Sequence, residues 1–202
     1  MMDSCLYNTC LDIRQLIIIR IMNSSNLFKV NKFCRPTLAT MALIYITAFI
    51  FIALARMNFP FELNWMEGGM LDVVNRALDG KPIFAEPNID YVPFIYTPLY
   101  FYVSALVAKI IGSGFTALRL VSFISTIGSF LIIFLFVWRE TRNKFIGLLS
   151  VGMFAAFYDF SDTWYDIGRN DSLCLFLLLL ALFLIRFYQN YGSFIISGIL
   201  YF

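Results

Sequence analysis

The stretch Ala117–Trp138, ALRLVSFISTIGSFLIIFLFVW, decides what kind of protein this sequence forms. Arg119 is its single charged residue, and apolar side chains fill most of the other positions. A helix needs about 20 mostly apolar residues to cross the hydrocarbon core of a bilayer, which is about 30 Å thick. The stretch meets that length, so we predict that it spans a membrane.

Apolar runs of similar character recur at Thr37–Ala55, Phe145–Tyr158 and Ser172–Phe187. Hydrophobic residues make up 60% of the 202 residues and charged residues 14%, whereas soluble domains are roughly 45–50% apolar. We therefore predict an all-α fold, a polytopic bundle of membrane helices. The last apolar run, Phe194–Phe202, is too short to span, and we expect the chain to be the incomplete N-terminal part of a longer protein.

The charges between the apolar runs predict the orientation of the chain. Five basic residues precede the first span, and positively charged flanks stay on the cytoplasmic side. We expect residues 1–36 to form a cytoplasmic extension and residues 37–202 to form the transmembrane domain. The first span then delivers residues 56–116 to the outer side as a long loop. The five basic residues are Arg14, Arg20, Lys29, Lys32 and Arg35.

A second basic cluster bears on the number of spans. Arg139, Arg142 and Lys144 are cytoplasmic only if one of the two apolar runs before them does not cross the membrane. The run Pro93–Ile111 contains two prolines and several tyrosines, and tyrosine favours the membrane interface. We predict that Pro93–Ile111 is a juxtamembrane helix on the outer face, and that residues 159–171 form a second outer loop on the same side.

The composition excludes several classes of site. The sequence has no histidine, which rules out histidine-based triads, metal sites and general bases. None of the four cysteines forms a C-x-x-C pair, so we expect unpaired thiols and no metal or redox site. The net charge of +2 comes without a basic stripe that carries interleaved aromatic residues, and we expect no nucleic-acid partner.

The first outer loop contains a short amphipathic pattern. Apolar residues recur at helical spacing from Met70 to Leu78, and Gly80 follows as a stop signal. Glu67 stands at the start of this helix, where the helix dipole favours a carboxylate. Position alone leaves two interpretations of Glu67 open: a residue that only caps the helix, or a residue that belongs to a functional site.

The second outer loop brings charged residues up to the start of the next span. They include Asp166, Arg169 and Asp171. Ionisable groups at membrane depth are costly, and they usually pair with one another or line a polar cavity. Arg169 can pair with Asp166 or Asp171, or bind a phosphate through two parallel hydrogen bonds. A solvated loop without a chemical role is the other interpretation.

At these loops the sequence resembles the integral-membrane glycosyltransferases of the C superfamily, in the branch of the protein mannosyltransferases and lipid A aminoarabinose transferases. Short motifs match in the family order over about residues 40–190. They are Trp65–Gly68 (W-x-E-G), Arg76–Gly80 (R-x-L-x-G), Tyr96–Tyr100 (Y-x-P-L-Y), Arg119–Ser122 (R-x-x-S) and Arg169–Leu173 (R-x-D-S-L). Met66 stands where many members of the family have Asp.

The resemblance implies a hexosyl- or glycosyltransferase. Such an enzyme moves a sugar from a polyprenyl- or dolichyl-phosphate donor to an acceptor hydroxyl on the outer face, with inversion. By the resemblance, Glu67 is the general base and Asp171 is the acidic residue of the second loop that shapes the same catalytic site. The substrate-binding residues that it implies are Arg169 and Lys81 for the donor phosphate, Tyr96 for the lipid or sugar, and Asp166.

We expect no obligatory cofactor and no protein-bound metal, although a divalent cation would suit the chemistry because it can stabilise a departing phosphate. The expected partners are the lipid-linked sugar donor and membrane lipid, with the oligomeric state left open. We expect an integral, multi-pass protein of the plasma (inner) membrane rather than of the endoplasmic reticulum. A truncated, non-catalytic membrane protein with a structural role stays open as the alternative, and a transporter, which would carry its charges at mid-span, is a third.

Overall fold

The computed structural model describes residues 34–89, 91–188 and 190–201, so most of the predicted extension 1–36 lies outside the described residues. Contacts divide the chain into two units, Met1–Thr40 and Met41–Phe202. Within the described residues there are seven helices and no strand, which confirms the all-α prediction. The helices are α2 (Cys34–Met57), α3 (Met66–Leu78), α4 (Pro98–Ile111), α5 (Phe115–Thr141), α6 (Lys144–Ala156), α7 (Asp171–Phe187) and α8 (Tyr191–Tyr201).

Two helices, α2 with 24 residues and α5 with 27, are long and apolar enough to cross a membrane. In α2 the side chains of Leu43, Ile44, Phe51 and Leu54 are each more than half exposed. An array of exposed apolar side chains this large is unusual on a water-facing helix and is expected on a lipid-facing one. The length and the exposed apolar faces together support a membrane protein.

The other predicted spans are helical but shorter than the first two. The run Ser172–Phe187 corresponds to α7, which has 17 residues and lies at the lower limit for a span. The run Phe145–Tyr158 corresponds to α6, whose 13 residues extend about 20 Å. Helix α6 ends at Ala156 because the chain then enters a series of turns, in which Asp162 and Thr163 have positive φ.

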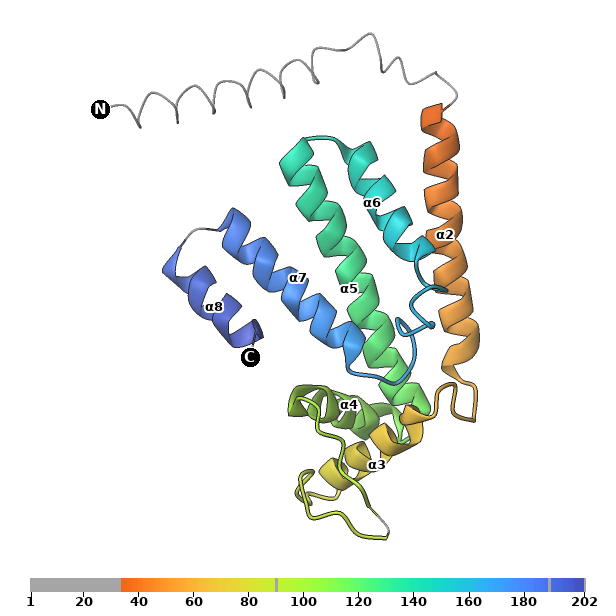
Figure 1. Ribbon diagram of the computed structural model, residues 1–202, viewed down its shortest axis with the longest axis vertical. Helices are drawn as coiled ribbons and strands as arrows, with labels where there is room; N and C mark the ends of the chain where they lie inside the picture. Colours follow the sequence, from red (N-terminus) through yellow and green to blue (C-terminus); the bar gives the residue numbers. More distant parts are fainter. Residues whose placement is uncertain (1–33, 90, 189, 202) are drawn as a thin grey trace, which may run out of the picture. The chain divides into compact units, whose positions relative to one another are not determined.

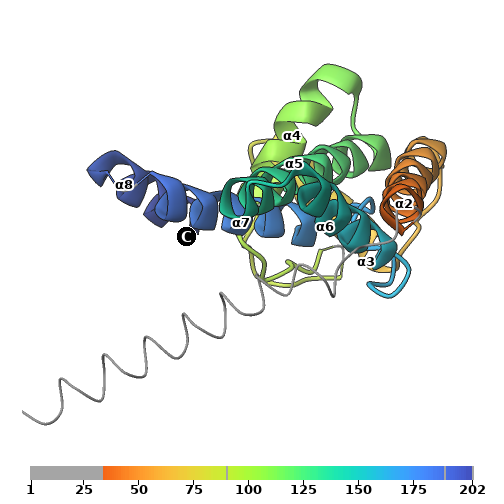
Figure 2. The same ribbon diagram turned by 90° about the horizontal axis from the view of Figure 1, so that it is seen from above.

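Helix α5 is the central element of the second unit. Figure 1 shows α6 and α7 along its two sides, and α8 packs on α7 beyond it, as Figure 2 also shows. Small hydroxyl residues of α5 are buried at these contacts, and their hydroxyls bond to carbonyls of α5 itself or of the second loop. Small residues let neighbouring helices approach closely in a membrane. These residues are Ser122, Ser125, Thr126 and Ser129.

Residues of α2 from Met41 onward pack against α5 and α6 around Phe49, which is 2% exposed. The ring of Phe49 lies 5.3 Å from the rings of both Phe130 and Tyr158, measured between centroids. Nearer the start of α2, Ala42 touches α6 at Gly152, where an added Cβ would come within 2.6 Å of the Cα of Ala42. The contact between these two helices therefore depends on a residue without a side chain.

Helices α3 and α4 lie across the end of α5 at which that helix begins (Figure 1). Their shared core is fully buried and contains Met70, Val74, Phe101 and Leu118. The predicted amphipathic helix is confirmed as α3, and Gly80 follows its end with a φ of 69°, a conformation that favours glycine. Helix α4 has 14 residues and is about 21 Å long, which like α6 is shorter than the hydrocarbon core of a bilayer, but unlike α6 it does not run alongside α5 (Figure 1).

We expect the substitution Gly152→Ala to lower the thermal stability of the detergent-solubilised protein by several degrees. The new methyl group would meet both Cβ and Cα of Ala42, so α2 and α6 would have to separate. Gly198 is the matched control, since it also lies in a helix but has open space where a Cβ would go. Gly198→Ala should leave the melting temperature unchanged or raise it slightly, because alanine favours a helix. Equal melting temperatures for the two variants would contradict the close helix contact.

Candidate functional site

The centre of the site is a buried ion pair between α3 and α5. Glu67 is 0% exposed and Arg119 is 1% exposed. Arg119 Nε donates to Glu67 Oε1 at 3.0 Å, and Arg119 Nη2 donates to Glu67 Oε2 at 2.7 Å. This two-point geometry is the strongest arrangement available to an arginine and a carboxylate. Removing either partner would leave an uncompensated buried charge.

Glu67 accepts two further hydrogen bonds from backbone amides. The N–H of Leu63 donates to Oε2 at 2.7 Å, and the N–H of Gly168 donates to Oε1 at 2.6 Å. Burial by itself would raise the pKa of Glu67, but the hydrogen bonds from Arg119, Leu63 and Gly168 outweigh it and hold the pKa below its ordinary value. Glu67 is therefore an ionised carboxylate whose two oxygens each accept two hydrogen bonds.

Arg119 uses its remaining N–H groups on the last turn of α2 and on the segment that connects α2 to α3. Its Nη1 donates to the carbonyls of Arg56 at 3.2 Å and Phe59 at 2.6 Å, and its Nη2 donates to the carbonyl of Phe61 at 2.7 Å. Together with Glu67, these acceptors engage all five donors that a guanidinium has. The end of α2 and the start of α3 are thereby held around one side chain.

The second loop carries a more exposed pair immediately before α7. Arg169 Nε donates to Asp171 Oδ2 at 2.7 Å, and the side chain of Asp171 is 38% exposed. The guanidinium of Arg169 also stacks over the ring of Trp164, 4.1 Å from its centroid. Ser122 of α5 donates to the carbonyl of Arg169 at 3.1 Å. Of the two partners that the sequence left open for Arg169, the structure gives it Asp171.

Asp166 is buried in a separate cluster and is only 2% exposed. Tyr158 donates to its Oδ1 at 2.7 Å, and Arg56 Nε lies 3.6 Å from its Oδ2. Burial raises the pKa of Asp166, and the hydrogen bond from Tyr158 and the charge of Arg56 oppose this only in part. These contacts join the end of α2 to the second loop. Because Asp166 is buried among internal partners, its substrate-binding role stays a prediction.

Tyr96 and Lys81 lie in different surroundings. The hydroxyl of Tyr96 is 3.9 Å from the sulfur of Met66, so this tyrosine contacts the residue next to Glu67. Lys81 is 58% exposed and pairs with Asp79 at 2.8 Å, just beyond α3. No interaction within the described residues connects Lys81 to Arg169 or Asp171. The roles predicted for Tyr96 and Lys81 stay predictions.

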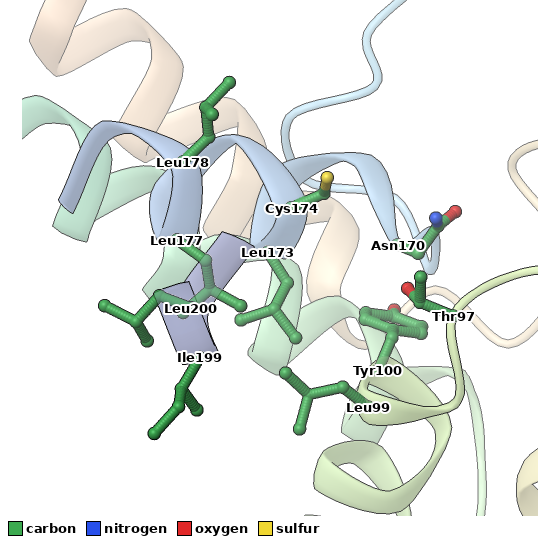
Figure 3. Close-up of a pocket in the computed structure, with 10 residues that line it drawn as sticks. All are labelled: Thr97, Leu99, Tyr100, Asn170, Leu173, Cys174, Leu177, Leu178, Ile199 and Leu200. Atoms are coloured by element: carbon green, nitrogen blue, oxygen red, sulfur yellow. The ribbon is translucent and has the colours of Figure 1, made fainter. Parts of the chain in front are cut away.

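Two cavities adjoin the second loop. One, of about 360 Å³, lies between α4, α7 and α8; Figure 3 shows polar Thr97 and Asn170 at one end, and leucine and isoleucine side chains of α7 and α8 at the other. Asn170 Oδ1 is buried there without a hydrogen-bond partner in the described structure. The second cavity, of about 210 Å³, is lined by Trp164, Tyr165 and Asp171 among others. Asp171 thus borders open space, whereas Glu67 does not.

A metal ion bound by the protein alone needs several ligand side chains close together. In the part of the chain that the structure describes, no three Asp, Glu or Cys side chains come together closely enough to hold a metal ion.

Sequence reasoning did not single out Arg119, Arg56 or Tyr158 as parts of a site. In the sequence Arg119 stands out only as the start of a family motif. Its position inside an apolar span does indicate a buried ion pair, because a lone charge there must find partners. The hydrogen bond from Tyr158 to Asp166 had no such signal. The two residues meet only because the turns that follow α6 bring them together.

We expect Arg119→Gln to destabilise the protein by about 3–5 kcal/mol, since Glu67 would be left buried with its charge unpaired. Thermal or denaturant unfolding in detergent would measure the change. Arg186→Gln is the matched control because Arg186 pairs with Glu140 on the surface, where the side chain of Arg186 is 57% exposed. That variant should unfold like the wild type. Equal stability of the two variants would show that the buried pair contributes little.

The comparisons with known proteins agree with the resemblance inferred from the motifs. The family model described as dolichyl-phosphate-mannose-protein mannosyltransferase matches residues 93–201, which is more than half of the chain. The chain matches no curated protein and no solved structure. The matched segment contains Arg119, Arg169 and Asp171, while Glu67 precedes it. The chain is therefore a membrane protein of the dolichyl-phosphate-mannose-protein mannosyltransferase family, whose members are C-type glycosyltransferases that use a lipid-linked sugar donor.

Proposed function

We propose that this chain transfers a sugar from a polyprenyl- or dolichyl-phosphate donor to an acceptor hydroxyl on the outer face of the membrane, with inversion at the anomeric carbon. The observation that carries the proposal is the Arg169–Asp171 pair, which lies within the family-matched segment and of which Asp171 lines the smaller of the two cavities next to the second loop. It combines a reachable carboxylate with a guanidinium at the boundary of an apolar helix.

The general base is best assigned to Asp171. A base must come within about 2.6–3.2 Å of the group that loses the proton. Asp171 is accessible to such a group because its side chain is 38% exposed. Glu67, to which the sequence analysis gave this role, has no exposed surface, and all of its acceptor positions are engaged. The contacts therefore favour Asp171 over Glu67.

Arg169 is suited to the donor phosphate. Its Nε donates to Asp171, while its Nη atoms have no hydrogen bond within the described residues. Guanidinium groups bind phosphate oxygens through parallel hydrogen bonds. A cation at this point would stabilise the negative charge that develops on the leaving phosphate. The apolar side chains of α7 and α8 at the larger cavity are compatible with the hydrocarbon chain of a lipid donor.

The proposed reaction is a single displacement. Asp171 accepts the proton of the acceptor hydroxyl while the hydroxyl oxygen forms a bond to the anomeric carbon. The bond between that carbon and the phosphate oxygen breaks on the opposite side, and the lipid phosphate leaves with the bonding electrons. Attack opposite the leaving group inverts the configuration at the anomeric carbon.

A non-catalytic, structural role is the competing proposal, and two observations favour it. Met66 occupies the position at which many family members have an acidic residue, and it is buried against the first core cluster. Its neighbour Glu67 is fully engaged in internal contacts. If the base has to come from the first loop, as the family motif implies, these two residues leave the chain without one.

We expect Asp171→Asn to reduce sugar transfer by about 100-fold or more, because general-base catalysis contributes at least this factor. The assay would use membranes containing the protein and a panel of radiolabelled polyprenyl- and dolichyl-phosphate sugars. Asp159→Asn is the control, since Asp159 is an exposed aspartate of the same loop. Transfer that survives in Asp171→Asn would exclude this base, and absence of transfer by the wild type would exclude the enzyme proposal.

The outer-face assignment predicts which positions an impermeant thiol reagent can reach. In a variant with all four native cysteines replaced by serine, Asp79→Cys and Asp159→Cys should react from outside intact cells. Thr141→Cys, which is exposed at the end of α5 next to the basic cluster, should react only after the membrane is made permeable. Reaction of Thr141→Cys in intact cells would contradict the proposed topology.

A further inference from the structure

We propose that Glu67 and Arg119 are positioning residues, and that their ion pair fixes the second loop so that Arg169 and Asp171 face the substrate. This inference rests on the proposed function, because it concerns the same site. It assigns to Glu67 a role other than the base that the family motif implies.

Every hydrogen-bond acceptor position of Glu67 is already occupied. A carboxylate offers about four acceptor positions, and Glu67 fills them with Arg119 twice, Leu63 once and Gly168 once. A proton acceptor for a substrate would need to give up one of these bonds. It would also need a path through the core, because the side chain of Glu67 has no accessible surface.

Glu67 is connected directly to the second loop through Gly168. The N–H of Gly168 donates to Glu67 Oε1 at 2.6 Å, across 101 residues of sequence. The approach favours glycine, because a Cβ at position 168 would lie 3.0 Å from the Cβ of Leu118 and 3.3 Å from Glu67 Oε1, and these neighbours would have to shift by a few tenths of an ångström. Arg169 follows at once and is itself held through its carbonyl by Ser122. The position of the Arg169–Asp171 pair therefore depends on the anchored Gly168.

Arg119 connects Glu67 to the segment around the end of α2. This residue holds Glu67 at two points and at the same time holds the carbonyls of Arg56, Phe59 and Phe61. It can therefore orient Glu67 against a segment that is itself fixed. With Arg119 removed, Glu67 would lose this orientation and Gly168 would lose a fixed acceptor. We therefore predict that the reaction slows because Arg169 and Asp171 are misplaced, and not because a proton acceptor is lost.

The test compares Glu67→Gln, Arg119→Gln and the surface control Glu140→Gln in two assays. The first is limited proteolysis with trypsin in detergent, with fragments identified by mass spectrometry. Arg169 is 8% exposed in the intact loop, so cleavage after it should be slow in the wild type and in Glu140→Gln. We expect cleavage after Arg169 to become at least 10-fold faster in the other two variants, with little change at Arg142, which is exposed at the opposite end of α5 from Arg119.

The second assay is the pH dependence of sugar transfer. If Glu67 is a positioning residue, Glu67→Gln should lower the maximal rate by about 10- to 100-fold, and the acid limb of the pH–rate profile should stay where it is in the wild type. Loss of that limb in Glu67→Gln, with Arg169 still protected from trypsin, would make Glu67 the base and overturn the proposal.

The two assays separate the failure of this proposal from the failure of the proposed function. If the wild type transfers no sugar, the proposed function fails, and the proteolysis result still decides whether Glu67 and Arg119 hold the second loop. Protection of Arg169 in both variants would then overturn the positioning role. Faster cleavage at all sites together would also overturn it, because it would show general unfolding in place of release of this loop.

Discussion

A guanidinium cannot be deprotonated in a protein, so when the fold buries it, each of its N–H groups must find an acceptor. Arg119 stands in the first turns of α5, the longest apolar helix in the described residues, and is almost fully buried. The acceptors are one carbonyl in the last turn of α2, two carbonyls of the segment that follows it, and Glu67 of α3. The requirement of one side chain thus determines how three parts of the chain meet at the end of a membrane helix.

The same pairing extends to the second loop, because Glu67 has acceptor positions left after binding Arg119. One of them receives the N–H of Gly168. Arg169 is the next residue in the chain. Asp171, two residues after it, begins α7 and remains partly exposed. The two carboxylates therefore differ in environment: one is internal and saturated, and the other is at the edge of a cavity. In enzymes, such differences in environment separate groups that hold a structure from groups that exchange protons.

The sequence predicted the helices well, because long apolar runs and a helical spacing of apolar residues are local signals. It placed Ala117–Trp138 within α5 and Met70–Leu78 within α3. It did not reveal that Glu67 and Arg119 pair, since the partners are 52 residues apart and no local pattern links them. It also treated Asp166 and Asp171 as members of one acidic loop. Only the fold separates them, by burying Asp166 against Arg56 and Tyr158 while leaving Asp171 exposed.

The coupling between Glu67 and Arg119 is central to the proposed site, and a double-mutant cycle can measure it. Equilibrium unfolding in detergent would be compared for the wild type, Glu67→Gln, Arg119→Gln and the double variant. If the buried pair organises the site, the two substitutions should be non-additive, with a coupling free energy of about 1–3 kcal/mol, and the double variant should be more stable than the sum predicts. Additivity within about 0.5 kcal/mol would show that the two residues act independently and would contradict the account.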